Sequence, residues 1–142
     1  MAISFKYKRV RRAEGVERKL PYIPVFFKKG FSWIQTMALL DSGADVSVMP
    51  KDFAELLGLE FVGEEEKANG IGGEVRVINS KTEVMIKKGH ESYEFSMPVQ
   101  VVLDDTKAPV IIGREGFFDE FVIEFNHSLE KIKLKRISKG LF

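Results

Sequence analysis

The sequence predicts a mostly-β single domain, closed into a barrel and carrying one or two short helices. Short runs of Val, Ile and Phe alternate with polar residues at the spacing of strands, and twelve glycines supply turns between them. The chain has 142 residues, 44% of them apolar, which suits one domain around one core. No internal repeat or long linker divides the chain. We therefore expect the strands to close on one another.

The first half of the chain predicts one long strand and one short helix. Residues 31–40 are apolar on both alternations, which predicts a strand buried on both faces. Residues 50–57 predict a helix, because Pro50 suits its first turn and Gly58 can take the left-handed conformation that ends it.

The second half of the chain predicts hairpins. Between residues 74 and 102 the apolar positions alternate, and turns are expected at 79–81 and at 88–90. The expected elements after this region are a strand at 110–112, a short helix within 114–120, and a hairpin that joins 121–125 to 132–134 through a turn at 126–128.

Composition and charge disfavour several classes of protein. The net charge of +1 gives no global attraction to nucleic acid, and no apolar stretch approaches the roughly 20 residues of a membrane-spanning helix. The N-terminus lacks the apolar segment of a signal peptide. The sequence has no cysteine for a disulfide or thiolate site and only two histidines, His90 and His127. We expect no metal, no cofactor, no membrane association and a reducing, cytoplasmic location.

The N-terminal region differs in charge from the rest of the chain. We expect residues 1–20 to form a basic arm and residues 21–142 to form the folded domain. Residues 6–19, KYKRVRRAEGVERK, carry most of the positive charge of this arm. A solvated, partly mobile terminus accounts for such a run more often than a nucleic-acid-binding arm does. Aromatic and basic residues do not interleave elsewhere in the sequence, so nucleic acid is not an expected partner.

The stretch ALLDSGADVSVMP, residues 38–50, places two carboxylates and three small residues inside an apolar run. Asp41 follows directly after the predicted buried strand. An aspartate at such a position often begins a turn, but an isolated buried carboxylate is costly and must be hydrogen-bonded, paired or protonated. The small residues Ser42, Gly43 and Ala44 let another backbone approach closely. This pattern favours two such loops that face each other.

Three stretches resemble the retropepsin family, the aspartic proteases of retroviruses and their cellular relatives. Residues 38–45, ALLDSGAD, resemble the active-site loop of that family. Residues 69–73, NGIGG, resemble the glycine-rich tip of the flap, the hairpin that covers the substrate. Residues 108–114, APVIIGR, resemble its late strand and the start of its C-terminal helix. Because all three occur in the family's order, the resemblance implies a retropepsin-like acid-protease barrel and aspartic endopeptidase activity on peptide or protein substrates.

The resemblance also implies a homodimer. Enzymes of this class use two carboxylates that share a proton, because two acids at close range cannot both ionise. The ionised acid takes a proton from the attacking water, and the protonated acid polarises the scissile carbonyl. This chain has one Asp-Ser-Gly motif and no room for a second lobe. The catalytic Asp41 therefore needs a second Asp41 from another copy on a two-fold axis.

The resemblance assigns supporting roles to the rest of the loop. Ser42 is expected to hydrogen-bond across the dimer, Gly43 to let a substrate backbone pass, and Ala44 to keep the loop small. Asp45 and Arg114 resemble an ion pair that ties this loop to the C-terminal helix. The alternative for Arg114 is a surface arginine at the start of a helix.

The glycine-rich stretch has two interpretations. Gly70, Gly72 and Gly73 permit the positive φ angles of a tight hairpin tip, and an ordinary hairpin would explain them. Beside the catalytic motif we expect a lid that closes over an extended peptide and donates backbone hydrogen bonds from Ile71 and Gly72. Three apolar residues that suit the core equally well are candidate walls for the side-chain pockets: Leu39, Ile71 and Ile111.

Two features depart from the family and leave the geometry of the dimer open. The viral enzymes end soon after the strand that matches residues 121–126, whereas this chain continues through 129–134. Its N-terminal arm is also longer and more basic. An alternative to the protease is a catalytically inactive retropepsin-fold module that dimerises or binds peptide. A nucleic-acid-binding protein that acts through residues 6–19 is a third hypothesis, and the intact Asp-Ser-Gly motif favours the enzyme.

Overall fold

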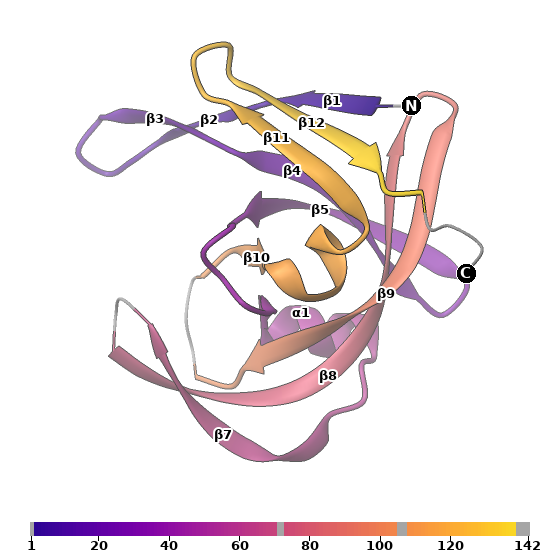
Figure 1. Ribbon diagram of the computed structural model, residues 1–142. Coiled ribbons are helices and arrows are strands. Elements are labelled where there is room, and N and C mark those ends of the chain that lie inside the picture. The colour runs from indigo at the N-terminus through magenta and orange to yellow at the C-terminus, as the bar shows by residue number, and fades with distance from the viewer. Residues whose placement is uncertain (1, 71–72, 105–107, 139–142) are drawn as a thin grey trace.

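Two sheets and a projecting hairpin make up the fold (Figure 1). The structure is a computed structural model that describes residues 2–70, 73–104 and 108–138. Its strands are β1 (Ala2–Lys6), β2 (Lys8–Arg11), β3 (Glu17–Leu20), β4 (Tyr22–Lys29), β5 (Ser32–Leu40), β6 (Ser47–Pro50), β7 (Val62–Gly70), β8 (Gly73–Lys88), β9 (Glu91–Val102), β10 (Val110–Ile112), β11 (Phe121–Asn126) and β12 (Lys131–Arg136). Its helical segments are α1 (Lys51–Leu57) and the short turn η1 (Arg114–Phe118).

The larger sheet has the strand order β4-β5-β10-β6-β9-β8-β7. β4 also pairs with β8, through Phe26 with Met85 and Phe27 with Val84. The mostly-β fold with short helices is confirmed. The closed barrel stays a prediction, because in the described part of the chain only these two residue pairs join β4 to β8.

The core forms where the strands turn alternate residues inward. In β4, Ile23, Val25 and Phe27 are fully buried, while the residues between them are partly exposed. Each side chain of this size stabilises the fold by about 1.5–3 kcal/mol when it leaves water. α1 closes one end of the core with Ala54 and Leu57.

The smaller sheet, β1-β12-β11, brings the two ends of the chain together. β1 buries Ile3 and Phe5, and β12 buries Ile132 and Leu134, again at alternate positions. The C-terminal extension is therefore the central strand of a sheet that packs on the core. Within the predicted N-terminal arm, β1 belongs to this sheet, whereas β2 and β3 pair with each other. The division of the chain at residue 20 stays a prediction.

Several local predictions are confirmed. α1 follows Pro50 and ends at Gly58, whose φ of 72° is the left-handed conformation that glycine adopts without strain. The 88–90 turn joins β8 to β9, and the final hairpin joins β11 to β12. The helix expected within 114–120 is the short turn η1.

The prediction that residues 31–40 are buried on both faces is wrong. Phe31 is fully exposed, and only Ala38 and Leu40 in this stretch are buried. β4 pairs along nearly the whole of β5, whereas β10 pairs with β5 only at residues 38–40. The apolar run therefore extends beyond the part of the sheet that a second neighbour covers.

The turn predicted at 79–81 is also wrong, because β8 continues through it in register with β9. Asn79, Ser80 and Lys81 are turn-forming residues. Ser80 is nevertheless buried, and its hydroxyl donates a hydrogen bond of 2.6 Å to the carbonyl of Glu60. This bond satisfies the polar group that would otherwise oppose its burial in a strand.

Among the described residues, no helix is long and apolar enough to cross a membrane.

The Leu134→Ala variant tests whether the C-terminal extension is part of the core. Because Leu134 is fully buried, we expect the free energy of unfolding to fall by about 2–5 kcal/mol in urea denaturation. The neighbouring Lys135→Ala variant removes an exposed side chain, and we expect a change within about 0.5 kcal/mol. Equal stabilities for the two variants would contradict the packing of β12.

Candidate active site

Asp41 lies where β5 leaves the sheet. β10 runs parallel to β5, with Ile112 opposite Leu40. The Asp41 N–H continues this ladder and donates a 2.9 Å hydrogen bond to the carbonyl of Ile112. The backbone of the aspartate is therefore fixed by the sheet, while its side chain is half-buried at the sheet edge.

The loop folds back on the carboxylate of Asp41. Oδ1 accepts a 2.9 Å hydrogen bond from the N–H of Gly43, and the Asp41 carbonyl accepts a 3.2 Å bond from the N–H of Ala44. A Cβ built at Gly43 would lie 3.2 Å from Oδ1, closer than ordinary contact. The small residues of the motif thus let the loop wrap tightly around one oxygen of the carboxylate. Ser42 and Gly43 are exposed.

A shallow hollow of about 320 Å³ opens beside Asp41 and Ser42. Its other lining residues come from the segment after β1, the end of β3 and its link to β4, the end of β5, and the end of β11 with the turn that follows it: Tyr7, Lys19, Leu20, Pro21, Leu40, Phe125 and His127. The rings of Tyr7 and His127 meet edge to face with centroids 5.7 Å apart. Burial raises the pKa of Tyr7, so its hydroxyl stays protonated at neutral and acidic pH. Most of this lining is apolar, and Asp41 is the one carboxylate among the described residues that line the hollow.

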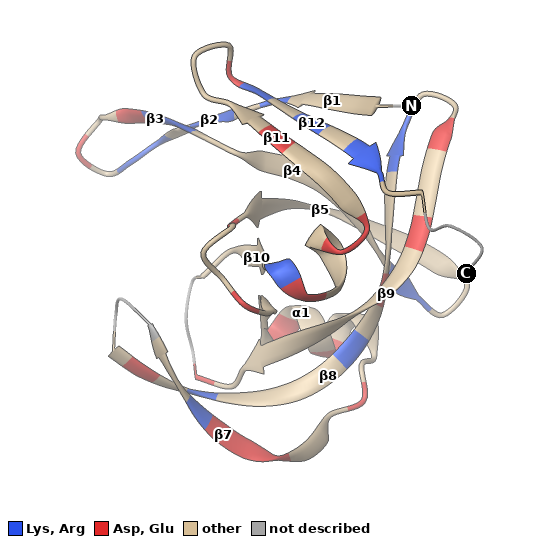
Figure 2. Cartoon of the chain, in the orientation of Figure 1, with Lys and Arg blue, Asp and Glu red and all other residues tan. Residues whose placement is uncertain are grey.

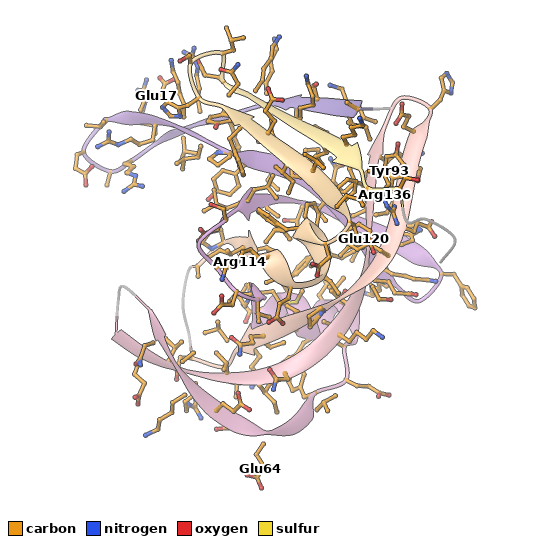
Figure 3. The ribbon with its side chains drawn as sticks, in the orientation of Figure 1. Glu17, Glu64, Tyr93, Arg114, Glu120 and Arg136 are labelled. Carbon is orange, nitrogen blue, oxygen red and sulfur yellow. The ribbon has the colours of Figure 1, made fainter. Side chains whose placement is uncertain are left out.

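An ion pair joins the loop to η1. The guanidinium of Arg114 binds Oδ1 of Asp45, and its Nη1 donates a 3.3 Å hydrogen bond to the Ser42 carbonyl. The backbone adds two bonds, from the Arg114 N–H to Ala44 O and from the Glu115 N–H to Asp45 O. Figure 3 shows Arg114 beside the helical turn at the centre of the molecule. The predicted pair is thus formed, and the loop is attached to η1 by side chains and backbone together.

The junction between β10 and η1 requires a glycine. A Cβ at Gly113 would lie 2.6 Å from the backbone of Val46 and 2.9 Å from the carbonyl of Ala44, too close for any side chain. The N–H of Gly113 donates a 3.0 Å hydrogen bond to the hydroxyl of buried Ser47. Gly113 therefore lets η1 lie directly against the loop.

The hairpin formed by β7 and β8 carries the glycine-rich stretch for which a flap is predicted. It projects on the same side of the molecule as the β5–β6 loop (Figure 1). Gly70 pairs with Gly73 at its end, and Gly73 has a φ of 108°. Ile71 and Gly72 lie outside the described residues, so their predicted contact with substrate stays a prediction.

A second set of contacts, between Arg76 and Asp104, holds the base of this hairpin. The Arg76 N–H and Nε donate hydrogen bonds of 2.6 and 3.0 Å to the two carboxylate oxygens of Asp104. The Leu103 N–H donates to the carbonyl of Arg76, and Nη1 of Arg76 lies 3.5 Å from Glu65. The hydrogen bond from the Arg76 backbone, aided by the side chain, lowers the pKa of Asp104. Asp104 therefore stays ionised in mildly acidic solution.

Leu39 and Ile111 face each other across β5 and β10 and are both half-buried. The hollow beside Asp41 is lined by Leu40, not by either of these residues. Their role as pocket walls stays a prediction.

The hollow and the Arg76–Asp104 contacts could not be predicted from the sequence. The lining comes from segments more than a hundred residues apart, and no spacing pattern connects them. Arg76 and Asp104 are 28 residues apart and meet because β8 and β9 are antiparallel. Within the described ranges, His, Asp and Glu form no group of three or more that could hold a metal ion.

A family model described as aspartyl protease matches residues 32–115, and no curated protein matches significantly. A retropepsin-like aspartic protease from Rickettsia conorii is similar in structure, with a TM-score of 0.55, 18% identity, and coverage of 94% of this chain and 91% of that chain. The retroviral protease-like domain of Ddi1 from Leishmania major has a TM-score of 0.51 and 17% identity, with coverage of 84% and 94%. The chain thus has the retropepsin-like fold.

A third solved structure, the EIAV protease in complex with the inhibitor HBY-793, is 26% identical. The match covers 68% of this chain and 83% of that chain, with a TM-score of 0.40.

The Arg114→Ala variant tests the attachment of the loop. We expect a loss of about 1 kcal/mol in unfolding free energy, because the ion pair is exposed, and faster amide exchange at Gly43 and Ala44. Lys51→Ala breaks an ion pair of comparable exposure on α1 and should leave exchange in the loop unchanged. Unchanged exchange in Arg114→Ala would show that the pair does not hold the loop.

The Asp104→Asn variant tests the contacts between Arg76 and Asp104 at the β7–β8 hairpin. Because the folded-state pKa of Asp104 is lowered, its ionisation stabilises the fold above the ordinary aspartate pKa, and this contribution is lost as the pH falls through the lowered value. We expect the variant to melt below the wild type at neutral pH and the gap to narrow in strong acid. Asp52→Asn, which changes an exposed residue of α1, is the control. A gap that does not depend on pH would contradict the assignment.

Proposed function

This chain belongs to the aspartyl protease family, and we propose that it is a homodimeric aspartic endopeptidase whose catalytic water lies between two Asp41 carboxylates, one from each subunit. The observation that carries the proposal is the Asp41 loop. Its backbone is fixed by β10 and η1, while its carboxylate borders an open hollow whose described lining residues include no second acid. A second copy would supply that acid.

The chemistry requires two unequal carboxylates. Aspartic proteases in general hold one proton between two nearby acids, since two negative charges at close range repel. The ionised carboxylate accepts a proton from water as the oxygen attacks the peptide carbonyl. The protonated carboxylate hydrogen-bonds that carbonyl oxygen as charge develops, and a proton is then delivered to the leaving amine. In this chain the N–H of Gly43 donates to Oδ1 of Asp41, which orients the carboxylate for these steps.

The remaining loop residues position the reacting groups. We assign to Ser42 a hydrogen bond across the dimer axis, which its exposure permits. We expect Gly43 to let the substrate backbone pass close to the loop. Asp45 and Arg114 hold the loop against η1. The effect is preorganisation, because a loop that is already fixed loses little entropy when the substrate binds.

The substrate in this proposal is an extended peptide. The flap would cover it and pair with it through backbone hydrogen bonds, as an added strand, while apolar walls that include Leu39, Ile71 and Ile111 receive alternate side chains. The contacts between Arg76 and Asp104 hold the base of the flap in place during closure. The cytoplasmic location of the enzyme stays a prediction.

The Asp41→Asn variant tests the chemistry. We expect the wild type to cleave an unfolded protein or peptide between apolar residues, best at mildly acidic pH, where the pair holds one proton. Asp41→Asn should lower the cleavage rate by about 10³-fold, because a carboxamide cannot exchange the proton. Asp52→Asn is the matched control and should retain the rate.

Undiminished cleavage by Asp41→Asn would rule out this mechanism. Absence of cleavage by the wild type, with peptide binding retained, would support the catalytically inactive module instead.

A further inference from the structure

We propose that the β2–β3 hairpin, residues 8–20, is a dimerisation arm that docks on a second copy of this chain beside the Asp41 loop. The inference rests on the proposed function, because the Asp41 site contains one carboxylate per chain. The hairpin is the surface that would position the second copy.

The hairpin has little support from its own chain. Within the part of the chain that the structure describes, β2 and β3 pair only with each other, from Lys8 with Leu20 to Arg11 with Glu17. No residue of either strand is buried. A two-stranded hairpin without a covering layer is at best marginally stable in water. A partner surface would supply the missing layer.

The base of the hairpin, in contrast, is anchored to the β11–β12 turn. Glu130 lies 2.9 Å from Nζ of Lys19 and 3.8 Å from Nε of Arg9, and its carbonyl accepts a 2.8 Å hydrogen bond from the Tyr7 N–H. Nζ of Lys8 lies over the ring of Tyr22, 5.9 Å from its centroid. The hydrogen bond from Lys19 lowers the pKa of Glu130, which keeps this anchor charged in mild acid. The hairpin is therefore held in a defined direction although its strands are exposed.

The hairpin extends past the Asp41 loop. Lys19 and Leu20, at the end of β3, line the same hollow as Asp41. The hairpin and the flap project from the same side of the molecule, with the β5–β6 loop between them (Figure 1). A second copy that brings its own Asp41 to this hollow must lie alongside the hairpin. Two-fold symmetry then places each arm against the body of the other copy.

The charge of the hairpin favours this occupant. Residues 8–20 hold six Lys and Arg against two Glu, a net charge of +4, whereas the whole chain carries +1. The remaining residues therefore carry −3, so the net charges of one copy's arm and of another copy's body are opposite in sign. Figure 2 shows Lys and Arg along the hairpin and along β12, and acidic residues on β7.

Charge reversal in the arm tests this inference. The Arg12→Glu/Arg18→Glu variant changes two exposed cations that lie outside the Glu130 anchor. The matched control, Lys29→Glu/Lys87→Glu, changes two exposed lysines of β4 and β8 away from the hairpin. Dimer dissociation constants are measured by sedimentation equilibrium at low and high ionic strength, and thermal melting checks the fold of each variant. Binding of a labelled single-stranded oligonucleotide and of its duplex is followed by fluorescence anisotropy.

We expect the arm variant to raise the dissociation constant about tenfold or more, because four charges are reversed in each symmetric dimer. The control should match the wild type, whose dimer should weaken with salt. Equal constants for both variants, or a chain that stays monomeric at every concentration, would overturn the inference. So would oligonucleotide binding that the arm variant loses without any change in dimerisation.

Peptide cleavage is measured on the same samples. Above its own dissociation constant, the arm variant should cleave as fast per dimer as the wild type, since the arm touches no reacting group. If no sample cleaves but the dissociation constants shift as expected, the proposed function fails and the arm inference stands.

Discussion

The account depends on how tightly the Asp41 loop is joined to β10 and η1. One backbone bond, from the Asp41 N–H to the Ile112 carbonyl, extends the parallel ladder to the predicted catalytic residue. Gly113 lets η1 approach the loop so closely that no side chain would fit between them. The Asp45–Arg114 pair and two further backbone bonds then hold the far end of the loop. The position of one carboxylate is thereby set by the core of the fold and not by a flexible segment.

In the proposed mechanism, a fixed carboxylate is only half of the chemistry. The hollow beside Asp41 is apolar over most of its lining, and Asp41 is the one acid among the described residues that line it. Its walls include the segment after β1, the end of β3 and the β11–β12 turn. These segments therefore border the place to which the proposed dimer would bring a second carboxylate. In that proposal, their contacts decide how the two copies meet.

Local features of the fold could be predicted from the sequence, whereas features that depend on distant segments could not. The Asp-Ser-Gly loop, the end of α1 at Gly58 and the Asp45–Arg114 pair follow from residue types at short spacing or from resemblance. The burial of β5 was predicted wrongly, because β10 covers only residues 38–40. A turn at Ser80 was predicted wrongly, because the carbonyl that satisfies its hydroxyl is twenty residues away. The hollow requires four segments that only the tertiary structure brings together.

The most direct test of a shared active site is the stoichiometry with which a statine-peptide inhibitor binds. Isothermal titration calorimetry at a protein concentration where mass measurements show dimers would count inhibitor molecules per chain. If two Asp41 carboxylates form one site, a single inhibitor binds for every two chains, and Asp41→Asn abolishes the binding heat. One inhibitor per chain, or binding that survives the substitution, would contradict the account.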